Sequence, residues 1–531
     1  MHVTDNIREA ALVGVLTAGA LALRFLGLAE GDFWVDELFT RTVVDNTPGR
    51  VGEAVLDTES SPHLYYLLAW AWSGVLGTDE AGLRSLSAIA GALVTPVAYV
   101  TLHQVGLRTE ALIAGALAAA SPLLVWYSQE ARVYSLFALL TALCLLFVVR
   151  LLTQFSVRAL IGWSIVSAAA LLTHYFALFT IAGMAAVLFY RHRAHWRPIA
   201  LSLLPTAVAG FALFPTIAAQ RTSEKTDWIA EISLTERVLQ VPEHFLTGVT
   251  YPPHAVVLVV GLLAAVGVAG VLLHGKRGQV VGKGLLAVVA VSAGIAALGL
   301  PVNDFVISRN LLGVILPLLL AISVGLGAPR LRPVGPFIAV TLVGLLAWMS
   351  IAAEYDDDVE RPPWGAAADA IAEVGEPDMV LACCGTLAAP APHYLEALES
   401  YDAHAMGDVE VREVFLASIW RPDRRPEDDF CWWGSSCQAN DVLGPGGPPS
   451  YHRELSTAFG SVFDLVETSA RGPIKLERYR STTPVTLGAT SRIRLEGGDV
   501  VVVDGDRSVN GVEVLVSPRL RKPVASLRTR P

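Results

Sequence analysis

The chain has little charge for its length. Only 17% of its 531 residues are Asp, Glu, Lys or Arg, whereas 53% are hydrophobic and the mean hydropathy is +0.51. Soluble domains carry about 25% charged residues and show shorter apolar runs. The composition therefore excludes an ordinary soluble protein and indicates a multi-pass membrane protein.

The chain also has few basic residues, few cysteines and no evident signal-peptide cleavage site. The formal net charge is −10, which argues against a nucleic-acid partner. None of the five cysteines, including the adjacent Cys383 and Cys384, has the spacing of a metal site. No small-residue cleavage site follows the first hydrophobic run before an acidic loop, so we expect this run to remain as a membrane span.

Eleven apolar runs reach the length of about 17 to 25 residues that crosses a bilayer. They begin near Ala10, Ala81, Ala111, Val133, Leu160, Tyr175, Ile199, Ala255, Gly284, Val306 and Pro336. A further run, 64–77, is only about fourteen residues long and is too short to span comfortably. We therefore predict a helical bundle of about eleven spans, with 64–77 as an interfacial or re-entrant helix.

Basic residues set the orientation of these spans. With the N-terminus in the cytoplasm, every cytoplasmic loop is basic, as the positive-inside rule requires. These loops hold Arg108, Arg150, Arg158, the cluster at 191–197, Lys276, Arg277, Lys283, Arg330 and Arg332. Counting 64–77 as a span would move the same residues outside.

The prediction divides the chain into a membrane domain, 1–353, and an extracytoplasmic domain, 354–531, of α/β or α+β class. The first outer loop, 29–80, carries ten acidic residues and a short amphipathic helix candidate at 48–56. In the outer domain we expect a helix at 364–373 and strands at 378–382, 474–479 and 500–503. Its outside location permits a disulfide between Cys431 and Cys437.

An adjacent pair of carboxylates, Asp36 and Glu37, follows the first span. Carboxylates at a membrane face are costly unless they are solvated or paired, so the pair indicates chemistry or ion handling, or else an ordinary solvated loop. On the predicted topology other polar residues reach the same face, namely Arg84, Glu130, Arg132, Tyr134, His174, Tyr175 and Arg309. Arginine binds phosphate through two parallel hydrogen bonds, which suits a lipid-linked anionic substrate.

Each of these residues also has a purely structural interpretation. Arg84 and Arg309 are compatible with side chains that extend to the headgroup region, and Glu130 with Arg132 can close a turn. His174 fits a helix end, and Tyr134 fits an interfacial aromatic belt.

Four motifs in register resemble the membrane glycosyltransferases of the C-type fold, nearest the protein O-mannosyltransferases and the bacterial lipid A aminoarabinose transferases. They are Trp34-Val35-Asp36-Glu37, Ser61-Pro62-His63-Leu64-Tyr65-Tyr66-Leu67-Leu68, the segment 80–88 and the segment 121–134. Relatives often have His-Pro-Pro-Leu where this chain has Ser61-Pro62-His63-Leu64, which puts a family role for His63 in doubt. The Trp-Trp-Asp motif of oligosaccharyltransferases is absent, because Trp432-Trp433 precedes Gly434.

The resemblance implies an enzyme that takes a sugar from a polyprenyl phosphate on the outer face. It assigns Asp36 as the catalytic base, with Glu37 beside it, and places Arg84 on the donor phosphate. Candidate substrate-binding residues are His63, Tyr66, Glu130, Arg132, Tyr134, His174, Tyr175 and Arg309. The acceptor hydroxyl belongs to a protein, a lipid-linked glycan or an envelope polymer.

The chemistry of the leaving group bears on the need for a metal. A phosphate monoester is an acidic leaving group that needs charge stabilisation more than a proton or a metal, although a divalent cation near the acidic pair stays an open alternative.

A transporter or flippase is the alternative class of function, but the spans show no obvious inverted repeat. A carbohydrate-binding or assembly role for the outer domain on an inactive membrane core is a third interpretation.

Overall fold

The computed structural model describes residues 2–221, 229, 233–248, 253–300, 305–355, 364–374, 377–383, 391–395, 398–400, 409–419, 463–471, 474–487 and short strands between 492 and 516. Cys431 and Cys437 lie outside the described residues. Contacts divide the chain into two compact units. The first comprises Met1–Glu30 and Phe39–Val359, and the second comprises Gly31–Leu38 and Glu360–Pro531. The boundary between 353 and 354 that the sequence suggests stays a prediction.

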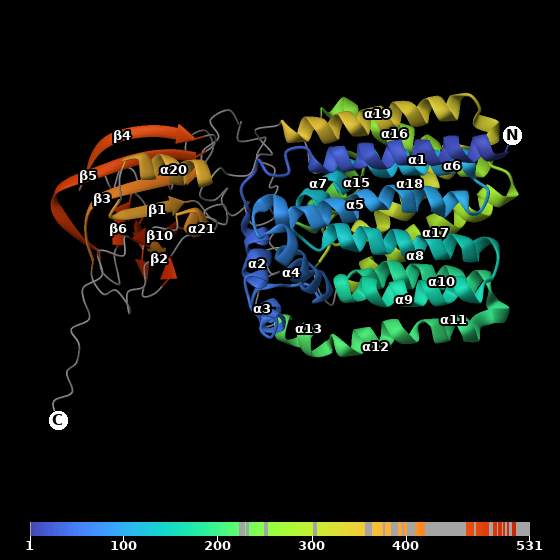
Figure 1. The fold of residues 1–531 in the computed structure, drawn as a ribbon, viewed down its shortest axis with the longest axis horizontal. Helices are drawn as coiled ribbons and strands as arrows, with labels where there is room; N and C mark the ends of the chain where they lie inside the picture. Colours follow the sequence, from blue (N-terminus) through green and yellow to red (C-terminus); the bar gives the residue numbers. More distant parts are fainter. Residues whose placement is uncertain are drawn as a thin grey trace. The chain divides into compact units, whose positions relative to one another are not determined.

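The described part of the first unit is helical, and its long helices lie side by side (Figure 1). Helix α2 (Val35–Val44) begins in the second unit and ends in the first. The other helices of the first unit are α1 (His2–Phe25), α3 (Val51–Thr58), α4 (Leu64–Leu76), α5 (Glu80–His103), α6 (Arg108–Ala120), α7 (Pro122–Trp126), η1 (Tyr127–Gln129), α8 (Tyr134–Thr153), α9 (Val157–Thr173), α10 (Ala177–Arg191), η2 (Arg193–His195), α11 (Trp196–Ser202), α12 (Leu204–Ala212), α13 (Phe214–Arg221), α15 (Leu234–Thr247), α16 (His254–Gly270), η3 (Val271–Leu273), α17 (Lys276–Gly299), α18 (Leu312–Leu326), η4 (Pro329–Leu331) and α19 (Val334–Glu354).

The chain is a multi-pass membrane protein. Among the described residues, five helices are long and apolar enough to cross a membrane, or up to seven if each of two bent pairs is one span. Every predicted run lies in a helix or a bent series of helices, but eleven crossings stay a prediction. The run at 64–77 forms the 13-residue helix α4, and the candidate at 48–56 forms α3 with a later start.

Two helix starts differ from the prediction. Helix α18 begins at Leu312 rather than near Val306, since the Asn310 side chain donates to the Phe305 carbonyl oxygen and stabilises a non-helical turn. Helix α17 begins at Lys276, so the three basic residues predicted for a loop lie on a helix.

Proline interrupts the third predicted span. Pro122 has no N–H for the carbonyl oxygen of Ala118, and α6 and α7–η1 meet at 54°. The freed carbonyl groups are satisfied from other helices. Arg24, which is fully buried, donates to the oxygens of Ala118 and Ala119, and Ser350 donates to the oxygen of Ala120. A break inside a membrane helix is tolerated when neighbours supply such partners.

The described part of the second unit contains a six-stranded sheet of order β2-β10-β1-β3-β5-β4. Its strands are β1 (Met379–Cys383), β2 (Glu399–Ser400), β3 (Val409–Ile419), β4 (Asp464–Arg471), β5 (Ile474–Leu487) and β10 (Val512–Val516). Two-stranded pairings join β6 (Arg492–Leu495) to β7 (Gly498–Val501) and β8 (Val503–Asp504) to β9 (Arg507–Ser508). Only β1 and β3 pair in parallel within the described sheet.

Helix α20 (Trp364–Val374) packs against this sheet, and α21 (Ala391–Tyr394) belongs to the same unit (Figure 1). Buried Trp364, Ile371, Phe415 and Leu476 form part of one apolar core. The helix predicted at 364–373 and the strands predicted at 378–382 and 474–479 are confirmed. The run at 500–503 is divided between β7 and β8.

Gly91 allows α5 to approach η1 closely. A β-carbon at this position would lie 1.9 Å from Ser128 Oγ and 3.0 Å from Arg24 Nε. We expect Gly91→Ala to destabilise the bundle by about 1–3 kcal/mol through overpacking. The measurement is the apparent melting temperature of the purified protein in detergent. The matched control is Gly19→Ala on α1, where a β-carbon meets nothing within 4 Å. Equal melting temperatures for the two variants would contradict this packing.

Candidate functional site

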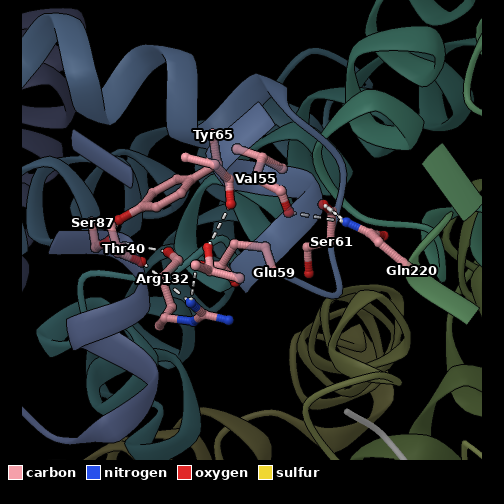
Figure 2. A network of polar contacts seen from close by, with 10 residues as sticks. Thr40, Val55, Glu59, Ser61, Tyr65, Ser87, Arg132 and Gln220 are labelled. Atoms are coloured by element: carbon pink, nitrogen blue, oxygen red, sulfur yellow. Dashed lines mark hydrogen bonds and ion pairs between the residues drawn. The ribbon is translucent and has the colours of Figure 1, made fainter. Parts of the chain in front are cut away.

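A buried ion pair lies at the centre of the candidate site. Arg132 Nη1 donates to Glu59 Oε1 at 2.7 Å, and the two side chains are only 5% and 1% exposed. The same Nη1 atom donates to Thr40 Oγ1 at 3.2 Å. Figure 2 shows the guanidinium directed toward both partners. Three separate segments are joined here: α2, the connection from α3 to α4, and the turn before α8.

Aromatic residues of α4 extend this network. The Tyr65 hydroxyl is 3.2 Å from Ser87 Oγ on α5, and Ser87 Oγ is 3.2 Å from the carbonyl oxygen of Arg132 (Figure 2). The guanidinium carbon of Arg132 lies 5.9 Å from the ring centre of Tyr66, within the range of a cation–π contact. The predicted residues Tyr66 and Arg132 are therefore neighbours, and Tyr65 and Ser87 hold their elements together.

Gln220, at the end of α13, connects α9–α10 to the segment between α3 and α4. The Tyr175 hydroxyl donates to Gln220 Oε1 at 2.7 Å. Gln220 Nε2 donates to the carbonyl oxygens of Ser61 at 3.2 Å and Val55 at 3.5 Å (Figure 2). The predicted residue Tyr175 thus reaches the loop between α3 and α4 through a glutamine that the sequence did not single out.

A second cluster surrounds Arg309, which follows α17 and is partly exposed. The rings of Tyr127 and Tyr134 are 4.7 Å apart, and His174 lies 5.9 Å from Tyr134. Arg309 is close enough to act electrostatically on both Tyr127 and His174, and Glu130 acts on Tyr127. Five predicted residues, Glu130, Tyr134, His174, Arg309 and Arg132, therefore share one electrostatic environment in the first unit.

The imidazole of His174 is uncharged in this cluster. Its ring stacks on Phe137 at 4.7 Å, and its Nδ1 accepts from the backbone N–H of Phe176. Burial first, and then the positive charges of Arg309 and Arg132, lower its pKa from 6.5 to about 3. A neutral imidazole leaves the arginines as the positive charges that an anion would meet.

His244 and Ser308 border the same cluster. The sequence analysis missed His244, whereas Ser308 adjoins the predicted residue Arg309. His244 Nδ1 lies 2.8 Å from Ser308 Oγ, and burial lowers the pKa of His244 to about 4. Tyr127 also forms a hydrogen bond with Ser308. No local pattern marks these residues, because α15 and the segment before α18 meet only in the folded chain.

The acidic pair occupies the first turn of α2. Glu37 is fully buried, and its Oε2 accepts from the backbone N–H of Trp34 at 3.4 Å, as the glutamate of a capping box does. Asp36 is partly exposed. The two carboxylates therefore differ: Glu37 stabilises the helix start, and Asp36 is accessible.

Arg84 and His63 have structural partners. Arg84 on α5 is fully buried, and its Nη1 donates to the Leu28 carbonyl oxygen at 3.0 Å just beyond α1. His63 precedes α4 and forms a hydrogen bond with the backbone of Gly52, while burial lowers its pKa. Within the part of the chain that the structure describes, no group of three or more His, Cys, Asp or Glu side chains has the arrangement of a metal site.

Comparisons with known proteins bear on the fold and on the class of protein. Residues 60–218 match the family described as dolichyl-phosphate-mannose-protein mannosyltransferase. No curated protein matches the chain. The crystal structure of ArnT from Cupriavidus metallidurans in the apo state is similar at a TM-score of 0.54 and 13% identity, over 88% of this chain and 98% of that chain. The crystal structure of ArnT from Cupriavidus metallidurans bound to undecaprenyl phosphate is similar at a TM-score of 0.54 and 13% identity. The match covers 88% of this chain and 97% of that chain.

At this identity the structural match shows the fold, and the family match adds the class of enzyme. The resemblance to the membrane glycosyltransferases of the C-type fold is confirmed. The match over residues 60–218 supports the class of membrane glycosyltransferases and covers less than half of the chain. The range 60–218 contains Arg84, Arg132, Tyr134 and His174.

The ion pair generates a stability prediction. Arg132→Met alone would leave the Glu59 carboxylate buried without its cation, and we expect a loss of about 3–5 kcal/mol. Adding Glu59→Gln removes that buried charge, so the double variant should recover part of the loss. The measurement is a double-mutant cycle of unfolding in detergent. Strictly additive losses would show that the two side chains are not coupled.

His174 generates a pH prediction. Below pH 6.5 the unfolded chain binds a proton on this histidine, whereas the folded chain does so only near pH 3. The free energy of unfolding should therefore fall as the pH falls through this window, by roughly 1 kcal/mol per pH unit from this residue. Melting temperatures between pH 7.5 and 5 should fall less steeply for His174→Gln than for the wild-type protein. Equal slopes of melting temperature against pH for the two proteins would exclude this contribution of His174.

Proposed function

We propose that this enzyme is an inverting glycosyltransferase that moves a sugar from a polyprenyl phosphate to an acceptor hydroxyl on the outer membrane face. The observation that carries the proposal is the convergence of Arg132, Tyr134, His174 and Arg309 around one buried network in the first unit. The match over residues 60–218 and the undecaprenyl phosphate bound to ArnT support this donor class.

We assign the general base to Asp36. An acceptor hydroxyl has a pKa far above neutrality, so its proton must leave as its oxygen attacks the anomeric carbon. The proton moves to the Asp36 carboxylate, the new carbon–oxygen bond forms, and the bond to the phosphate oxygen breaks with its electron pair. One displacement inverts the anomeric centre, and general-base assistance contributes about 10²–10⁴-fold. Partial exposure of Asp36 supports this role over the buried Glu37.

Arg309 and Arg84 are the proposed phosphate-binding residues. The leaving phosphate gains negative charge in the transition state, which a positioned guanidinium stabilises. Arg309 is partly exposed beside neutral His174, whereas Arg84 is fully buried and Arg132 is paired with Glu59. Exposure favours Arg309 for direct contact with the donor. The sugar and acceptor positions would be shaped by His63, Tyr66, Tyr134 and Tyr175.

The proposal includes the topology. Eleven spans with a cytoplasmic N-terminus place the ends of α1 and α9, the starts of α5 and α8, and the domain after α19 on the outer side. α3, α4 and α13 lie at the end of the first unit opposite the N-terminus (Figure 1). The acceptor is then an envelope polymer, a lipid-linked glycan or a protein.

The proposal is tested with purified enzyme in liposomes and a panel of synthetic polyprenyl-phosphate sugars. We expect one donor to be consumed, with inversion at the anomeric carbon and no change on adding a chelator. Asp36→Asn should lower kcat at least about 10²-fold with donor binding retained. Arg309→Met should raise the dissociation constant of the donor.

The control is Asp45→Asn, because Asp45 follows α2 and is half-exposed beside Arg41. This variant should retain transfer. Full transfer by Asp36→Asn would exclude the proposed base. Movement of the intact lipid-linked donor across the bilayer, with no sugar transfer, would favour a transporter instead.

A further inference from the structure

Two residues that shortly precede the acidic pair, Asp32 and Phe33, form hydrogen bonds with helices α20 and α21 of the second unit. Asp32 Oδ2 accepts the backbone N–H of Gly365 at 2.6 Å, across 333 positions of sequence. Gly365 is the second residue of α20, so this N–H has no carbonyl partner within the helix. Asp32 thus acts as a capping carboxylate for α20, supplied from a distant part of the chain.

Phe33 forms a second attachment. Its backbone N–H donates to the hydroxyl of Tyr394 on α21. Its ring is 1% exposed and meets His393 edge to face at 6.0 Å between ring centres. Both attachments lie in the second unit, to which Gly31–Leu38 belongs.

The attachment points belong to elements of one packed core. Trp364 and Ala367 of α20 are fully buried in the same apolar core as Ala391 of α21 and the strand residue Phe415. Two successive residues, Asp32 and Phe33, are therefore fixed to a packed sheet domain. Helix α2 starts only two residues later, at Val35, and Asp36 is in its first turn.

We propose that the C-terminal domain sets the position of the catalytic turn, with Asp32 and Tyr394 as positioning residues for Asp36. The inference rests on the proposed function, because it assumes that Asp36 is the base. A displacement of about 1 Å in a reacting group can lower the rate about 10²-fold. The domain then controls chemistry directly, rather than serving only to hold an acceptor.

The experiment compares Asp32→Ala, Asp32→Asn and Tyr394→Phe in the full-length enzyme in liposomes. Asp32→Ala should lower kcat about 10–100-fold and leave the dissociation constant of the donor within about twofold. Asp32→Asn should restore most of kcat, because an amide oxygen also caps a helix. Tyr394→Phe removes only the hydroxyl that accepts from Phe33 and should lower kcat several-fold, so it tests the inference if Asp32→Ala does not fold.

The matched control is Asp369→Ala, since Asp369 is exposed on the same helix, α20. This variant should keep wild-type kcat. Unchanged kcat in both Asp32→Ala and Tyr394→Phe would overturn the inference, and so would equal loss in Asp32→Ala and Asp32→Asn. If Asp36→Asn abolishes transfer while those variants do not, only the positioning inference fails; if Asp36→Asn is fully active, the proposed function fails.

Discussion

The ion pair between Arg132 and Glu59 is the interaction on which the candidate site depends. It joins the turn before α8 to the loop before α4, and Thr40 connects the same guanidinium to α2. Burying two charges is expensive, and this arrangement repays the cost only because both charges meet at short distance with a further hydrogen bond. The pair therefore holds together three segments that are far apart in the sequence.

The helix break at Pro122 is a second constraint on the turn that carries Arg132. Pro122 breaks the helix formed by α6 and α7, and the apolar surroundings require partners for the freed carbonyl groups. Arg24 supplies two of these partners and also donates to Ser128 Oγ in η1. Because η1 leads directly into the turn that carries Arg132, the packing of α1 contributes to the geometry of the site.

The acidic residues near the start of α2 divide three tasks among themselves. Asp32 caps α20, Glu37 accepts the N–H of Trp34 at the start of α2, and Asp36 stays accessible. Two carboxylates thus support the helix turn that presents the third. Such support is how a single carboxylate can be held in a productive orientation.

The sequence by itself determined the membrane class, the approximate helices and a family resemblance, because hydropathy and short motifs are local properties of the chain. It also predicted Asp36, Arg132, His174 and Arg309 as candidate site residues, and the structure brings the last three together in the first unit. It could not find their partners. Arg132 pairs with Glu59 across 73 positions, Gln220 binds Ser61 across 159, and Asp32 caps α20 across 333. Only the tertiary structure decides such pairings, because a hydrogen bond depends on where two segments meet in space, and no local pattern of residues encodes that meeting.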